Sequence, residues 1–143
     1  MKVVTWSDEY SVDIQEIDEQ HKVLVGLIND LYAALSHKDN YEEVRHVLDE
    51  LMNYTKVHFA VEECLLRMFE YPEYDQHKAI HDGIVEKLDR LYAQFKDGDH
   101  KVGMELLLFL KDWLMDHINR EDKKYSPHLR KHGVKKRWIK KFW

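Results

Sequence analysis

The chain has few of the residues that interrupt helices: five glycines and two prolines in 143 residues. No low-complexity segment appears, and apolar residues recur at spacings of three and four rather than two, so the pattern predicts an all-helical fold. The single cysteine, Cys64, excludes an internal disulfide and a thiolate metal cage. We expect Cys64 to be a small buried apolar side chain.

Long apolar runs are also missing. The longest, "LLLFL" at 106–110, is far shorter than the roughly 20 residues that span a bilayer. The first twenty residues contain neither the apolar stretch nor the cleavage pattern of a signal peptide. We therefore expect a soluble, cytoplasmic protein, and 44% hydrophobic residues suffice for the core of one domain.

The charges are unevenly distributed along the chain. All 27 acidic side chains lie within residues 1–122, where 13 lysines and arginines leave a formal charge of −14. Residues 123–143 contain nine basic and no acidic residues, which brings the formal charge of the chain to −5. The sequence therefore predicts an acidic domain, residues 1–122, followed by a basic tail, residues 123–143.

Four short segments divide the chain: "SHKDN" at 36–40, "EYPEY" at 70–74, "KDGDH" at 96–100 and "YSPH" at 125–128. They predict four helices, preceded by an N-terminal arm of about 15 residues. Short connections make neighbouring helices antiparallel. We thus expect an up-down-up-down four-helix bundle with an N-terminal arm and a short C-terminal basic helix.

Each predicted helix carries an apolar seam at three- and four-residue spacing, and each seam is interrupted by groups that bind metals. These are His21 on the first helix, His58 and Glu62 on the second, His77 and His81 on the third, and His117 on the fourth. Followed along an antiparallel path, all six fall near the same end of the bundle.

Burying such groups singly costs several kcal/mol, so they persist when paired or bound to metal. Five imidazoles and a carboxylate exceed the capacity of one ion and indicate two. Nitrogen and oxygen ligands without thiolate favour iron, with manganese or zinc as alternatives.

A second carboxylate should come from "HINREDKKY" at 117–125. Ideal helix geometry favours Glu121, four residues after His117, because a spacing of five rotates Asp122 by about 140° from it. A bridging ligand lies to one side of the terminal histidine, however, and a helix near its end can distort. Spacing alone leaves both residues open.

The segments "IDEQHKVLVGLINDL", "HFAVEE", "HKAIH" and "HINRED" resemble the hemerythrin family, specifically single-domain bacteriohemerythrins, from Trp6 to about Tyr125. The resemblance implies an oxo- or hydroxo-bridged pair of iron ions. Their ligands by position are His77, His81 and His117 for one iron, His21 and His58 for the other, and Glu62 and Asp122 as bridges.

These ligands leave one open position, on the iron with two histidines, which suits a single small molecule. The resemblance implies reversible O2 binding without enzymatic turnover, for transport, storage or delivery to an oxygen-consuming enzyme. The alternatives are an oxygen or redox sensor, a di-iron peroxidase or oxidase, and a nitric oxide scavenger. The expected apolar O2 pocket comprises Leu24, Phe59, Trp113, Leu114 and Ile118.

The tail places Val134, Trp138 and Phe142 four apart among basic residues. This pattern predicts a short amphipathic helix that docks through residues 134–143 on an anionic membrane surface or an acidic protein. The alternative is that the tail folds back onto the acidic bundle. We expect no nucleic acid partner, because no recognised binding module accompanies the basic residues, and we expect a monomer.

Overall fold

The computed structural model describes residues 2–99 and 101–132. Within them lie four long helices: α1 (Gln15–Leu35), α2 (Tyr41–Met68), α3 (Tyr74–Lys96) and α4 (Val102–His117). A 3-10 turn, η1 (Asp8–Tyr10), precedes them; a π-helical turn, η2 (Ile118–Asp122), and a short helix, α5 (Lys123–Lys131), follow α4 without a break. The predicted all-α fold is confirmed.

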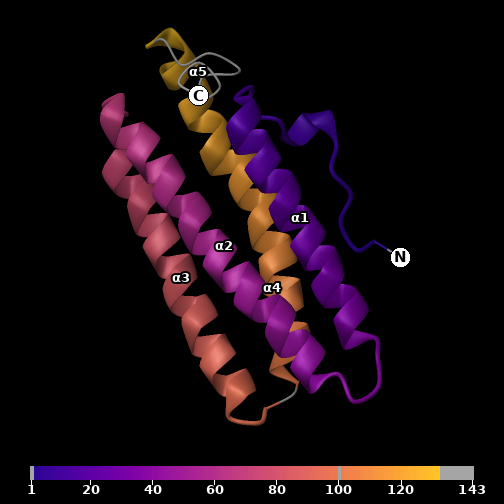
Figure 1. The fold of residues 1–143 in the computed structure, drawn as a ribbon. Coiled ribbons are helices and arrows are strands. Elements are labelled where there is room, and N and C mark those ends of the chain that lie inside the picture. The colour runs from indigo at the N-terminus through magenta and orange to yellow at the C-terminus, as the bar shows by residue number, and fades with distance from the viewer. Residues whose placement is uncertain (1, 100, 133–143) are drawn as a thin grey trace.

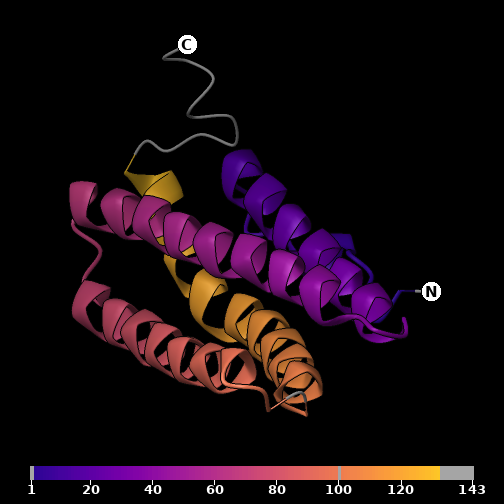
Figure 2. The ribbon, with the colours of Figure 1, turned by 60° about the horizontal axis from the view of Figure 1, so that its bottom comes forward.

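The four long helices form an antiparallel bundle. Figure 1 shows the α1–α2 and α3–α4 connections at one end, and the start of α1, the α2–α3 connection and α5 at the other. The packed pairs are α1 with α2, α2 with α3, α3 with α4, and α4 with α1. Figure 2 shows the same arrangement from a second direction. This is the predicted up-down-up-down topology.

The predicted seams form the core. Apolar residues three and four apart, such as Leu24, Ile28 and Leu31 on α1, are at most 1% exposed. Burial of one such side chain stabilises the fold by about 1.5–3 kcal/mol, which outweighs the modest helix propensity of any single residue. Trp113, placed on the fourth seam, is only partly buried.

The N-terminal arm is held along α1 by side chains of that helix. Asn29 Oδ1 accepts hydrogen bonds from the backbone N–H groups of Val3 (2.9 Å) and Val4 (3.0 Å), and Asn29 Nδ2 donates to the Val4 carbonyl (2.8 Å). Nearer the start of α1, the Asp18 carboxylate accepts from Ser11 Oγ (2.5 Å). These bonds fix the arm along α1, and the Asp18 contact holds its later residues beside the end of the bundle that contains the histidines.

The expected interruption at Pro127 is wrong, because the chain stays helical through it to Lys131. Proline removes the hydrogen bond to the carbonyl four residues earlier and disfavours a helix interior. Tertiary contacts override that preference here: Tyr125 and Leu129 are 1% exposed, and Ser126 Oγ donates to the Val12 carbonyl (2.5 Å). Residues 123–131 therefore pack with the bundle.

The prediction that Cys64 is buried is also wrong, because this side chain is exposed. Cys64 lies two residues after the buried Glu62, and at 100° per residue it points about 200° away from that side chain. Its position on the helix, rather than its apolar character, decides its exposure.

Within residues 2–99 and 101–132, no helix is both long and apolar enough to cross a membrane. The amphipathic helix expected around Val134, Trp138 and Phe142 lies outside the described residues.

Candidate metal centre

Seven buried side chains from four helices and the π turn meet at one end of the bundle, as expected from the sequence. Each is at most 4% exposed: His21 from α1, His58 and Glu62 from α2, His77 and His81 from α3, His117 from α4 and Asp122 from η2. Their ligand atoms form two overlapping groups, each with all its atoms within 4.8 Å of one another. One group is Glu62, His77, His81, His117 and Asp122; the other is His21, His58, Glu62 and Asp122.

The Glu62 carboxylate lies between the two sets of histidines. Its Oε1 lies 3.4 Å from His77 Nε2 and 3.2 Å from His81 Nε2. Its Oε2 instead lies 3.5 Å from His21 Nε2 and 3.3 Å from His58 Nε2. One oxygen therefore faces each set, which is the arrangement a carboxylate needs in order to bridge two cations.

Asp122 is placed in the same way, with one oxygen facing each set of histidines. Its Oδ1 lies 3.0 Å from His117 Nε2 and 3.3 Å from His77 Nε2, and its Oδ2 lies 3.1 Å from His21 Nε2. Yet neither Asp122 oxygen nor His21 Nε2 makes a hydrogen bond of acceptable geometry, although all three are buried. Buried polar atoms are normally satisfied. Atoms that converge at 3–3.5 Å without proper hydrogen bonds are those expected of metal ligands, so the donor set fits a pair of cations.

The π turn explains why Asp122, rather than Glu121, enters the cluster. The Lys123 N–H donates to the Ile118 carbonyl, five residues earlier, so the turn between His117 and Asp122 holds one residue more than an α-helical turn. A spacing of five thereby returns to the same face. Asp122 is fully buried, whereas the side chain of Glu121 is 25% exposed and pairs with Lys124 at 3.5 Å.

The electrostatics of the cluster are those of two carboxylates shared among imidazoles. Burial alone would lower the pKa of His21, but the carboxylates of Asp122 and Glu62 raise it to about 9. Burial likewise would lower the pKa of His77, but the same two carboxylates raise it to about 10. Burial lowers the pKa of His58. Despite burial, the neighbouring histidines hold the pKa values of Glu62 and Asp122 below their usual range, so both carboxylates are ionised.

Two of the clustered histidines are oriented by residues that the sequence reasoning missed. His58 Nδ1 lies 2.6 Å from Gln20 Oε1, and His81 Nδ1 lies 2.8 Å from Glu63 Oε2. Such partners fix the ring so that Nε2 points into the cluster. A signal was present in the sequence, since Gln20 directly precedes His21 and Glu63 directly follows Glu62.

A third missed residue contacts a carboxylate. The Tyr125 hydroxyl donates a hydrogen bond to Glu62 Oε2 at 2.9 Å. Tyr125 lies three residues after Asp122, so both side chains point inward from consecutive turns of the chain.

Of the five residues predicted to form an apolar pocket, two pack against histidine rings and three are buried in the core. Phe59 stacks on the His81 ring, with centroids 3.7 Å apart and planes at 5°, and meets Trp113 edge-on at 5.3 Å. The Trp113 ring lies 5.7 Å from that of His117. The other three, which are at most 1% exposed within the core, are Leu24, Leu114 and Ile118.

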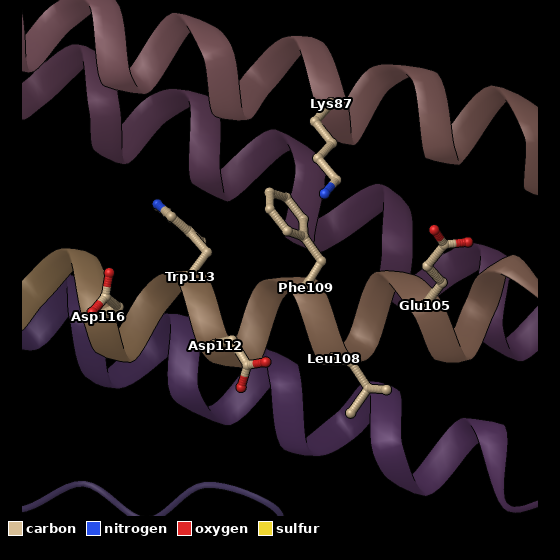
Figure 3. A pocket seen from close by; sticks show the side chains of 7 residues that line it. All are labelled: Lys87, Glu105, Leu108, Phe109, Asp112, Trp113 and Asp116. Carbon is tan, nitrogen blue, oxygen red and sulfur yellow. The ribbon is translucent and has the colours of Figure 1, made fainter.

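A surface pocket of about 630 Å³ between α3 and α4 reaches this layer from outside. Figure 3 shows Phe109 and Trp113 projecting from α4 towards α3, with the Lys87 side chain reaching down to Phe109. The Lys87 ammonium lies 4.3 Å from the centre of that ring. None of the seven clustered side chains lines the pocket. Trp113, which does line it, lies between the pocket and the His117 ring.

The histidines assigned to the surface are mostly exposed, but His128 is not. It is half-buried on α5, and its Nε2 lies 2.7 Å from the Phe69 carbonyl at the end of α2. It thereby helps to hold α5 against the α2–α3 connection. His100 lies outside the described residues.

Comparison with known proteins agrees with this geometry. Residues 12–129 match the family described as the hemerythrin HHE cation binding domain. The chain is 35% identical over 130 residues to a bacteriohemerythrin of Pseudomonas aeruginosa, covering 91% of this chain and 84% of the relative. It is 32% identical over 130 residues to a bacteriohemerythrin of Methylococcus capsulatus, covering 90% and 98%. A crystal structure of wild-type hemerythrin superposes with a TM-score of 0.84 at 31% identity, covering 89% of this chain and 98% of that one.

Proposed function

This chain belongs to the hemerythrin family, and from that membership we propose that its buried cluster binds two iron ions and, through them, O2 reversibly. Family membership implies non-haem iron; the number of irons and the use made of O2 are the proposal. The observation that carries it is the pair of overlapping ligand groups that share Glu62 and Asp122.

The ligand assignment follows from the two groups. His77, His81 and His117 would hold one iron, His21 and His58 the other, and the two carboxylates would bridge them. Imidazole and carboxylate donors suit iron, and the exposed Cys64 lies outside both groups. Bound iron would supply the two electrons that reversible O2 binding uses.

The surrounding residues would protect that chemistry from water. Leu24, Leu114 and Ile118 are buried apolar side chains, and Phe59 and Trp113 cover the three-histidine side of the cluster. An apolar shell lowers the local polarity and restricts solvent access, which are two of the ways a protein controls a metal site. We therefore favour oxygen transport, storage or delivery over catalytic turnover.

The test combines metal analysis with visible absorption. The protein, reduced without air, is exposed to O2 and then returned to argon. About two irons per chain and a colour change that reverses are expected from a di-iron oxygen carrier. Rapid, irreversible oxidation would contradict reversible binding and favour a sensor, a peroxidase or oxidase, or a nitric oxide scavenger. One iron or none per chain would contradict the di-iron assignment itself.

For residues 134–143 we keep the docking proposal, which rests on sequence alone: a basic, aromatic segment suits an anionic membrane or an acidic protein. Sedimentation with phosphatidylserine-containing vesicles at low salt, lost when residues 134–143 are deleted, is the expected result. No sedimentation of the full chain would contradict the membrane version.

A further inference from the structure

We propose that Tyr125 is a positioning residue of the metal centre that withdraws electron density from one end of the Glu62 bridge and so raises the reduction potential of the bound iron. This inference rests on the proposed di-iron function. It starts from an asymmetry between the two carboxylates, which otherwise occupy equivalent places among the histidines.

Glu62 and Asp122 differ in what else they contact. Glu62 Oε2, the oxygen that faces His21 and His58, accepts a hydrogen bond from the Tyr125 hydroxyl at 2.9 Å. Neither oxygen of Asp122 accepts a hydrogen bond of acceptable geometry within the described residues. A bridging carboxylate oxygen uses one lone pair for the metal and has a second for a donor. The tyrosine hydrogen bond and metal binding are therefore compatible.

The phenol is fixed in place by its surroundings. Tyr125 is 1% exposed, and its ring lies 5.6 Å from that of His77 and edge-on to Tyr71 at 6.4 Å. Burial, followed by the nearby carboxylates, raises its pKa well above the usual value. In this geometry the hydroxyl donates the hydrogen bond and the carboxylate accepts it.

The effect of that hydrogen bond has a definite sign. A donor to a ligand oxygen reduces the electron density which that oxygen gives to the metal, and hydrogen bonding around ligands is a recognised control of redox potential. The lower oxidation state is thereby favoured. Because Tyr125 acts on Oε2 and not on Oε1, the effect falls on the iron that His21 and His58 would hold.

The experiment compares Tyr125→Phe with Tyr71→Phe. Both variants lose one hydroxyl that donates to a carboxylate, but the Tyr71 partner, Glu73 at 3.2 Å, belongs to neither ligand group. The reduction potential of the iron-loaded protein is expected to fall in Tyr125→Phe and to stay at the wild-type value in Tyr71→Phe. Equal potentials in all three proteins, each with the same iron content, would overturn the proposal while leaving the di-iron function intact.

A second substitution at position 125 keeps the shape of the side chain and should shift the reduction potential in the opposite direction. Replacing Tyr125 with 3-fluorotyrosine makes the phenol more acidic and a stronger donor with little change of shape, so the potential is expected to rise. A fall, or no change, would overturn the assignment.

The metal-free protein gives an independent readout. The ¹³C resonance of the Glu62 carboxylate is expected to shift in Tyr125→Phe and not in Tyr71→Phe, and an unmoved resonance would overturn the contact. If the wild-type chain binds no iron, the proposed function fails and the control of potential fails with it, whatever the resonance shows.

Discussion

Replacing each of the two neighbouring acids of the π turn, Glu121 and Asp122, by its amide in separate variants tests the candidate site most directly. In Asp122→Asn the amide is nearly isosteric but cannot bridge two cations with two anionic oxygens. Asp122 is fully buried, with three imidazole nitrogens at 3.0–3.3 Å. Removing one partner from such a buried set costs about 3–5 kcal/mol. We therefore expect loss of stability in the metal-free protein, and iron content falling from about two per chain to below about one.

Glu121→Gln supplies the matched control. It makes the same chemical change one residue away, where the side chain is 25% exposed and pairs with Lys124 at 3.5 Å. An exposed pair of this kind contributes at most about 1 kcal/mol. The assay is iron per chain after dialysis, with urea unfolding of the metal-free form. Retention of full iron by Asp122→Asn, with loss in Glu121→Gln, would refute the assignment and the geometric reasoning behind it.

Three further predictions follow from named contacts. The pKa values of His21 and His77 are raised in the folded protein, to about 9 and about 10, so their protonation stabilises the metal-free fold fully below pH 6.5. The melting temperature of the metal-free protein should therefore fall as the pH rises from 6.5 to 10. An increase would contradict the shifts. Glu63→Ala should weaken iron binding by about 10–100-fold in a chelator competition, whereas Glu50→Ala, which loses an exposed histidine partner, should not. Asp18→Ala should lower unfolding free energy by about 1–3 kcal/mol in urea titrations without loss of iron.

The bundle was predictable because its core depends on a repeated pattern. Seams at three- and four-residue spacing predict which face is buried, and the antiparallel path places the histidines at one end, as the structure shows. The contacts that orient the clustered histidines were not predictable in the same way. Gln20 and Glu63 lie beside the seams, and their roles depend on the rotation of each helix by a few tens of degrees, which periodicity does not define.

The π turn is the most informative case, because the sequence contains a signal for it that spacing from His117 alone overlooks. Continued as an ideal helix, the α4 seam would bury Glu121, Lys124 and His128. The residues buried instead are Asp122, Tyr125 and Leu129, each displaced by one position. Two of these three are large hydrophobic or aromatic side chains, whereas all three alternatives are ionisable. A one-residue phase change in the apolar pattern therefore indicates an inserted residue, and an i→i+5 turn accommodates it without ending the helix. The same insertion that brings Asp122 among the histidines also brings Tyr125 against Glu62, so a single local departure from α-helical geometry supplies both one carboxylate of the cluster and the hydroxyl that contacts the other.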